Sequence, residues 1–128
     1  MISVFHSVLC SDAITDSRSG QISYVKVIDT VNAQQFPIAL KGVVLGMLCR
    51  SVTLEPSAVR IDLVAPDNTT MNIMMFKADI TSAPHKILIN IEQLPFTMEG
   101  LHTLLVSCKD TNVWKAVAST PINVISNS

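Results

Sequence analysis

The fold class is decided by the stretch Val59-Arg60-Ile61-Asp62-Leu63-Val64, which is followed by Pro66-Asp67-Asn68 and by residues 69–76. Apolar residues alternate with more polar ones along the first stretch, which is the pattern of a half-buried β-strand. Pro presets φ, and Asp and Asn tolerate unusual backbone dihedrals, so residues 66–68 indicate a tight turn. We therefore expect residues 69–76 to return as the second arm of a hairpin.

Similar apolar segments, separated by turn signals, continue in both directions along the chain. Val, Ile and Thr together make up 37 of the 128 residues, and these β-branched side chains suit a pleated sheet better than a helix. With the hairpin, they predict an antiparallel β-sandwich of about eight strands and almost no helix. The further strands are expected at residues 2–11, 22–31, 38–52, 86–94, 101–109 and 113–125.

Local sequence features predict further details of three of these strands and of one loop. Residues 11–21 are polar and are expected to form a loop, whereas the two faces of residues 22–31 are nearly equally apolar, so that strand is expected to be buried on both sides. Gly42 and Gly46 interrupt an apolar strand, which is typical of a bulge or of a close backbone approach. Pro121 indicates an edge position or a bulge, because it has no N–H to donate.

Length and charge exclude several classes of protein. A chain of 128 residues predicts one domain, residues 1–128. Nine basic and ten acidic residues give a net charge of −1, which argues against a general nucleic-acid binder. Hydrophobic residues make up 48% and charged residues only 15%, so the chain is not intrinsically disordered, and we expect a partner to cover part of an apolar surface.

No targeting segment or metal motif is recognisable. The first ten residues have no basic start, and the longest apolar run, residues 43–49, is too short to span a bilayer. We therefore expect a cytoplasmic protein that does not bind membranes. Cys10, Cys49 and Cys108 form no CxxC pair and lie in apolar stretches, so we expect buried thiols and neither a metal nor a cofactor.

Antiparallel strands bring alternate loops to the same end of a sandwich. With eight strands, the loops 12–20, 53–58, 77–85 and 109–112 share one end, which collects the candidate cluster Asp12, Asp16 and Asp110. One interpretation is a calcium or small-ligand site, because Ca²⁺ takes six to eight oxygen ligands. The other is a set of solvated loop acids, which the absence of a D-x-D-x-D run favours.

The sequence carries no catalytic signature. There is no G-x-S-x-G elbow, no phosphate loop and no dinucleotide fingerprint, and His102 is expected to be structural or on the surface. Trp114 is a candidate interface anchor, since Trp is enriched at binding hot spots, although it could equally pack in the core or at an edge. Charged residues are sparse in residues 101–105 and 117–125, which are expected to form exposed sheet edges.

These features favour a non-enzymatic module that acts by protein–protein contact. We expect a protein partner or a second copy of the chain, with a homodimer as the expected assembly, because two-fold dimers are the commonest oligomers. The calcium- or small-ligand-binding module is the alternative function.

The chain also resembles a bacterial family of small single-domain proteins of unknown function. The resemblance implies an immunoglobulin-like sandwich, but it supplies neither an activity nor site residues. Members often have two acids after the cysteine of the first motif, where this chain has one. The motifs that carry the resemblance are Leu9-Cys10-Ser11-Asp12, Ser19-Gly20-Gln21, residues 22–28, Phe36-Pro37, Leu94-Pro95-Phe96, Glu99-Gly100-Leu101-His102 and Pro121-Ile122-Asn123-Val124.

Overall fold

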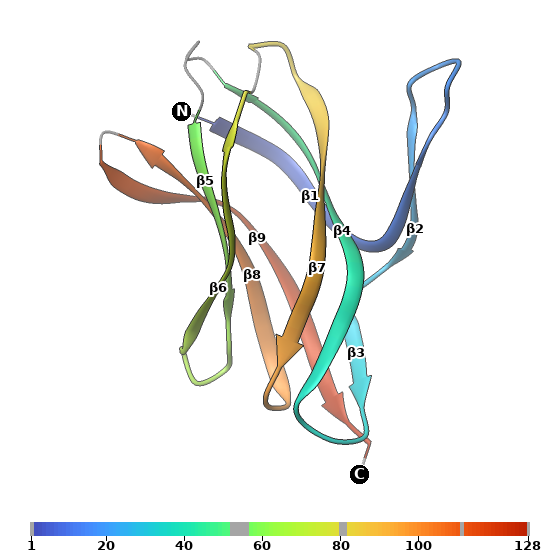
Figure 1. Ribbon diagram of the computed structural model, residues 1–128, viewed down its shortest axis with the longest axis vertical. Coiled ribbons are helices and arrows are strands. Elements are labelled where there is room, and N and C mark those ends of the chain that lie inside the picture. The colour runs from blue at the N-terminus through green and yellow to red at the C-terminus, as the bar shows by residue number, and fades with distance from the viewer. Residues whose placement is uncertain (1, 52–56, 80–81, 111, 128) are drawn as a thin grey trace.

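The computed structural model describes residues 2–51, 57–79, 82–110 and 112–127, and it confirms the predicted all-β class. Within these residues there are nine strands and no helix (Figure 1). The strands are β1 (Ile2–Thr15), β2 (Ile22–Val27), β3 (Thr30–Ala33), β4 (Ile38–Ser51), β5 (Ser57–Val64), β6 (Thr70–Ala78), β7 (His85–Phe96), β8 (Gly100–Asp110) and β9 (Val113–Ser126). No helix in these ranges is long and apolar enough to cross a membrane.

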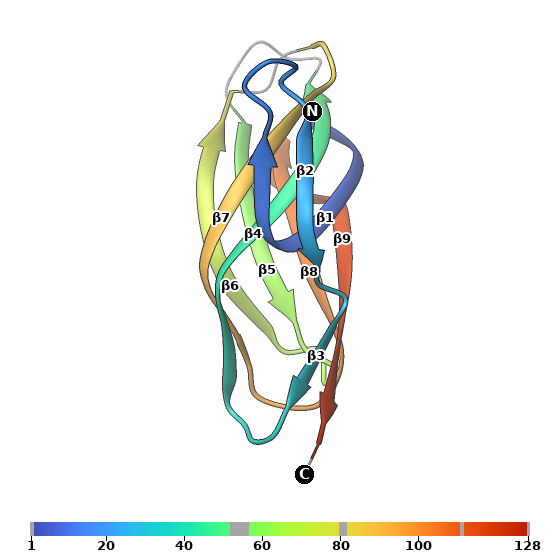
Figure 2. The same ribbon diagram turned by 90° about the vertical axis from the view of Figure 1, so that its right-hand side faces the viewer.

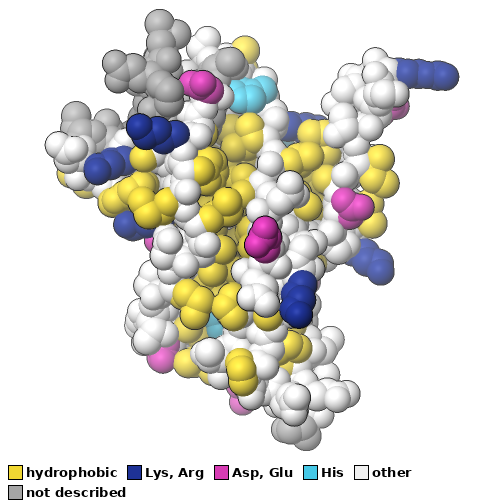
Figure 3. All heavy atoms as spheres, viewed as in Figure 1, with side chains coloured by type: hydrophobic (Ala, Val, Ile, Leu, Met, Phe, Trp, Pro, Cys, Tyr) yellow, Lys and Arg dark blue, Asp and Glu magenta, His cyan; other side chains and the backbone are white. Residues whose placement is uncertain are grey.

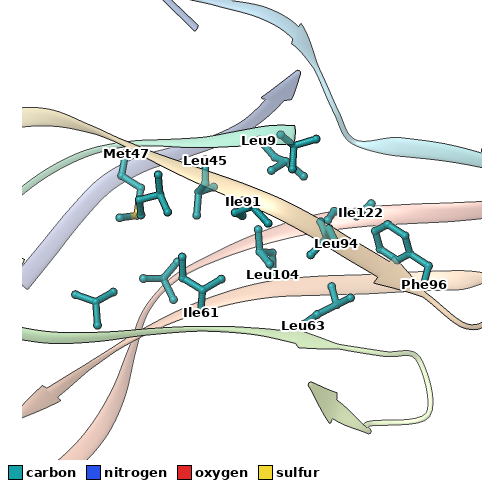
Figure 4. Close-up of a cluster of buried hydrophobic side chains, with 14 of the residues drawn as sticks. Leu9, Leu45, Met47, Ile61, Leu63, Ile91, Leu94, Phe96, Leu104 and Ile122 are labelled. Carbon is teal, nitrogen blue, oxygen red and sulfur yellow. The ribbon is translucent and has the colours of Figure 1, made fainter. Parts of the chain in front are cut away.

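The strands form two sheets that share one apolar core. One sheet has the order β2-β1-β4-β7, and the other has the order β3-β9-β8-β5-β6. Because side chains alternate along a strand, each sheet turns one row of apolar residues toward the other sheet. Their aliphatic side chains, with the ring of Phe96 at one end, meet between the sheets (Figure 4).

The predicted hairpin of residues 59–76 is present as β5 and β6. Val59 pairs with Phe76 and Val64 with Thr70. The turn between the strands is closed by the N–H of Asn68, which donates to the carbonyl of Ala65, and by the N–H of Ala65, which donates to Thr69. The carboxylate of Asp67 accepts the backbone N–H and the hydroxyl of Thr69.

The prediction of eight strands is wrong, because the segment 22–31 is divided between the two sheets. The N–H of Ile28 donates to Leu9 in β1, whereas the next carbonyl, that of Asp29, accepts the N–H of Asn123 in β9. The chain thus changes sheet between these two residues. The expectation that this strand is buried on both sides is wrong as well: β2 has no fully buried residue and Val27 is 61% exposed, whereas Val31 and Ala33 of β3 are buried. β3 runs parallel to β9, so the sandwich is not wholly antiparallel as predicted.

The expected loop at residues 11–21 is also shorter than predicted. β1 continues to Thr15 and pairs with β2 from Cys10 onward, after pairing with β4 from Ile2 to Cys10. A polar sequence can form a strand here because β2 and the end of β1 lie at the margin of the sheet. Figure 2 shows β1 bending between its two partners, which curls the four-stranded sheet.

The curl explains Gly46, where the prediction of a close approach is confirmed. A Cβ built on Gly46 would lie 2.5 Å from Cε1 of Tyr24, so the Tyr24 ring from β2 occupies the space above β4 that a side chain would need. Burial raises the pKa of the Tyr24 hydroxyl. The glycine therefore lets the β1–β2 hairpin lie close to the sheet.

Candidate interaction surfaces

The two sheets meet along one side of the sandwich and stay apart along the other. On the first side, Oγ of Ser7 in β1 lies 2.9 Å from Oγ1 of Thr120 in β9, within hydrogen-bonding distance. On the second side, β6 and β7 are the outermost strands of their sheets. We call this second side, formed by the free edges of β6 and β7, the open side.

Of the two predicted edges, residues 101–105 are not an edge, whereas residues 117–125 are one only up to Asn123. Residues 101–105 lie in β8, which is paired with β5 on one side and with β9 on the other, so they form the interior of the sheet. Residues 117–125 lie in β9, whose second neighbour, β3, pairs only from Asn123 onward. Pro121 precedes that pairing, so its missing N–H costs no ladder hydrogen bond, as predicted for an edge position.

A groove runs along the open side. It has a volume of about 340 Å³ and is lined by Ile73 and Met74 of β6 and by residues 90–93 of β7. Figure 3 looks onto this side and shows a stripe of hydrophobic side chains between the two strands. One lining residue, Ile91, is also a buried core residue, so the groove reaches the edge of the core.

The free edge of β6 is rich in methionine and poor in charge. Met71, Met74 and Met75 lie in this strand, and they are three of the six methionines in the chain. Met75 is 60% and Met71 43% exposed. Lys77 is the one charged residue of the strand. Long, uncharged edges are uncommon in proteins, because they pair readily with other strands.

The outer face of the five-stranded sheet carries Trp114, the predicted interface anchor. Trp114 is half-buried and pairs with Lys109 of β8, whose Nζ lies 5.9 Å from the ring centroid. The guanidinium carbon of Arg60, from β5, lies 4.6 Å from the same centroid. The ring is therefore flanked by two cations, in positions that favour cation–π attraction.

Arg60 is held in place by a chain of hydrogen bonds across the face. Its Nε donates to Oδ2 of Asp62 at 2.8 Å, and Nδ2 of Asn72 donates to Oδ1 of the same carboxylate at 3.0 Å. Asp62 is buried and paired, as a buried carboxylate must be. These hydrogen bonds thus hold the side chains of this array in defined positions.

Sequence reasoning identified Trp114 but missed Arg60, Asp62 and Asn72. The alternation of residues 59–64 does place Arg60 and Asp62 on one face of their strand, which is a local signal. Their neighbours follow from the register of strands that are distant in sequence, which links Arg60 to Ser107 and Asp62 to Asn72. That register has no local signature.

The three candidate loop acids are not brought together by the structure. Asp12 lies within β1, where its Oδ1 accepts the N–H of Ala13, and Asp16 accepts the N–H of Arg18 in the β1–β2 turn. Asp110 ends β8, and its side chain lies outside the described residues. As predicted, the β1–β2 and β8–β9 hairpins end toward the same end of the molecule, but they lie on opposite sides of it (Figure 1).

The described part of the chain shows no group of three or more His, Cys, Asp and Glu side chains that could hold a metal. The backbone N–H of Arg18 lowers the pKa of Asp16, with a smaller contribution from that of Ser19. This acid therefore orders its own turn. Calcium binding stays a prediction that these three residues do not support geometrically.

The cysteines are buried, as predicted. All three are free thiols. Burial raises the pKa of Cys10 and Cys49 and raises that of Cys108 to about 11. A thiolate is the nucleophilic form of cysteine, so none of these groups is activated at neutral pH.

His102 is buried, in agreement with a structural role. Its Nδ1 lies 3.0 Å from the carbonyl of Gly100, and its ring meets that of Phe96 edge-on at 5.0 Å. Nε2 has no hydrogen-bond partner among the described residues. A cavity of about 110 Å³, lined by His102 and by three threonines, lies beside it. We assign His102 to the packing at this end of the core.

Comparison with known proteins adds a family but no activity. No curated protein matches the chain. A family of unknown function, DUF6941, matches residues 6–125, which include every strand in whole or in large part. This agrees with the resemblance in the sequence motifs, which likewise carried no function. The chain therefore belongs to the DUF6941 family.

Proposed function

We propose that this protein is a non-enzymatic interaction module that assembles with a second copy of itself through the free edge of β6. One observation carries the proposal: the open side combines two unpaired strand edges with an apolar groove. An edge strand presents unpaired N–H and C=O groups, and adding a strand satisfies them. Assembly would also shield the groove from water, which is favourable in proportion to the apolar area covered.

The composition of β6 suits pairing with its own copy. Two identical strands pair antiparallel about a two-fold axis, which is the commonest symmetry of oligomers. If the axis passes near Phe76, then Lys77 lies opposite Met75 of the partner, so no like charges face one another. Methionine side chains adapt to irregular surfaces, and Met71 and Met75 are exposed beside this edge.

A bulge limits where pairing can occur. Met74 pairs with Ile61 and Asn72 with Asp62, which leaves Ile73 as an extra residue in β6. Bulges twist an edge and make it a poorer template for another strand. The regular stretch from Met74 to Ala78 is therefore the segment that we assign to the dimer contact.

The proposal is tested by size-exclusion chromatography with light scattering over a range of protein concentrations. We expect a concentration-dependent dimer. Met75→Lys should shift the equilibrium toward monomer, since it adds a cation opposite Lys77 of the copy. Leu101→Lys is a matched control, because Leu101 is also 60% exposed but lies on an interior strand.

Two results would contradict edge pairing. The unmodified protein could remain a monomer at the highest concentration, which would remove self-association altogether. Alternatively, Leu101→Lys could break the dimer while Met75→Lys does not, which would place the contact on the outer face of the sheet and not at its edge.

We also infer an immunoglobulin-like topology for the sandwich. In that fold, strands A, B, E and D form one sheet, and strands C, F and G the other, which C′ extends in variable-type domains. The strand order supports this assignment when β4 to β9 are read as B, C, C′, E, F and G. Cys49 and Cys108 then lie on B and F, the strands that a disulfide joins in antibody domains.

A cytoplasmic location belongs to the same proposal. The three cysteines are buried as free thiols, and proteins of reducing compartments keep their cysteines in this form. Fractionation of cells that produce the protein, with mass-spectrometric counting of free thiols, would test the assignment. A secreted protein with an oxidised cysteine pair would contradict it.

A further inference from the structure

The surroundings of Trp114 have more positive charge than negative. The register places three basic side chains on the outer face of the five-stranded sheet: Arg60, Lys77 and Lys109. Asp62 is the one acidic side chain that the strands place on this face among the described residues, and it is buried and bonded to Arg60. Asp79, which is exposed, follows directly after the end of β6. All three cations lie toward the same end of the sheet, where Figure 3 shows Lys and Arg side chains beside exposed hydrophobic ones at its left margin.

Asp62 leaves part of the Arg60 guanidinium available. The contact between them uses Nε of Arg60, and the second carboxylate oxygen of Asp62 is taken by Asn72. The side chain of Arg60 is 32% exposed, whereas that of Asp62 is 5% exposed. The terminal nitrogens of a guanidinium form a planar fork that matches a carboxylate.

Trp114 and Lys109 complete a site beside this fork. Lys109 is exposed and supplies a second cation near the ring. The half-buried indole offers an apolar surface for the methylene groups of an incoming side chain. Because Arg60 is already held by Asp62 and by the ring, binding would cost little side-chain entropy, which is the usual advantage of a preorganised anchor.

We propose that Trp114, Arg60 and Lys109 form a docking site for an acidic segment of a partner protein, with a Glu or Asp carboxylate bound between the two cations. Charge complementarity carries the choice of partner, since the described strands of this face carry three cations against one acid, an excess of two positive charges. The site is independent of dimerisation through β6, because the side chains involved project from the face of the sheet and not from its edge.

A nucleic acid is the less favoured occupant. Tryptophan beside cations also suits single-stranded nucleic acids, but such proteins track the phosphate backbone with an extended basic groove. Here the basic residues are few, and the chain as a whole has a net charge of −1. The two occupants can be separated by experiment.

Trp114 is the only tryptophan of the chain, so its fluorescence reports on the site directly. We would titrate the intact protein at low salt with an acetylated and amidated hexaglutamate peptide, with hexaglutamine as the uncharged control. We expect a saturable change in emission with hexaglutamate alone. Lys109→Gln should weaken binding about three- to fivefold, as expected for an exposed ion pair, and Arg60→Lys should weaken it further because the fork is lost.

The matched control is Lys86→Gln, which removes an exposed cation from β7 of the other sheet. Binding that is unchanged in this variant and weakened in Lys109→Gln supports the site. The proposal is overturned if hexaglutamate gives no saturable change, or if the two variants weaken binding equally, which would indicate diffuse electrostatics. Tighter binding of a thymidine oligonucleotide than of hexaglutamate would also overturn it, in favour of a nucleic-acid site.

Discussion

The two sides of the sandwich differ in how the core between the sheets is covered. Where β1 approaches β9, Ser7 and Thr120 lie within hydrogen-bonding distance, and Leu9 on β1 is almost completely buried. Where β6 faces β7, the strands stay apart, and a groove of about 340 Å³ separates them. Both sides border the same core. One side is therefore closed by the chain itself, whereas the other depends on solvent or on a partner for its cover.

The difference separates a side that contributes to folding from the side to which we assign the proposed association. A closed side buries apolar area within the chain, and this contributes to folding. On the open side, Ile73 and Met74 are only partly buried against the core, so they contribute less to folding, and the exposed strand edges and methionines are the features to which we assign association. Substitutions on the two sides should accordingly affect different measurements.

The largest contrast is expected between Leu9→Ala on the closed side and Ile73→Ala on the open side. Leu9 is 1% exposed, so its truncation should lower the free energy of unfolding by about 2–5 kcal/mol, the range for cavity-forming substitutions. Ile73 is only half-buried, so its truncation should cost about 1 kcal/mol. Urea denaturation followed by circular dichroism measures both. Equal losses would show that the open side is as well packed as the closed one.

A smaller loss of stability is expected at Gly46, and it tests whether this glycine lets the β1–β2 hairpin lie close to the sheet. A methyl group there would meet the Tyr24 ring, so Gly46→Ala should destabilise the protein by about 1–3 kcal/mol, as overpacking does. Tyr24→Ala removes the ring, and the double variant should lose little more than Tyr24→Ala alone. If the two losses simply add, the ring does not occupy the space above Gly46.

The closed and open sides also differ in how far the sequence predicts them. The alternation of residues 59–64 and the turn at Pro66-Asp67-Asn68 correctly predicted the hairpin that forms the edge of the open side. The split of residues 22–31 was missed, because two equally apolar faces fit a buried strand as well as a strand that changes sheet. What separates these cases is the hydrogen bond from Asn123 to Asp29, a partner more than ninety residues away.

The interaction surfaces show the same division between local and distant information. Trp114 was found from residue type alone, and buried cysteines were found from their apolar neighbours. The neighbours of Trp114 follow from the strand order β9-β8-β5-β6, which no local pattern encodes. The predicted edge at residues 101–105 was wrong for a related reason, since low charge marks a strand as apolar but does not say whether other strands flank it.

The smallest expected effect concerns the turn that joins β5 to the edge strand β6. The side-chain hydroxyl and then the backbone N–H of Thr69 hold the pKa of Asp67 below its usual value. A carboxyl group with a lowered pKa in the folded state stabilises the fold above its unfolded pKa of about 4, and that contribution is lost as the pH falls through the folded pKa. Asp67→Asn should therefore reduce the loss of stability below about pH 4.

The amide of asparagine can still accept the Thr69 hydrogen bonds, so the substitution removes the titration without removing the turn. Thermal unfolding between neutral and acidic pH measures the effect, and Glu92→Gln, an exposed acid on β7, controls for the loss of one negative charge. A difference from the unmodified protein that is the same at every pH would mean that Asp67 contributes through its charge or its shape and not through its titration. The turn joins β5 to β6, which borders the open side. The same variant should therefore leave amide hydrogen exchange unchanged in β1 and β9, which form the closed side.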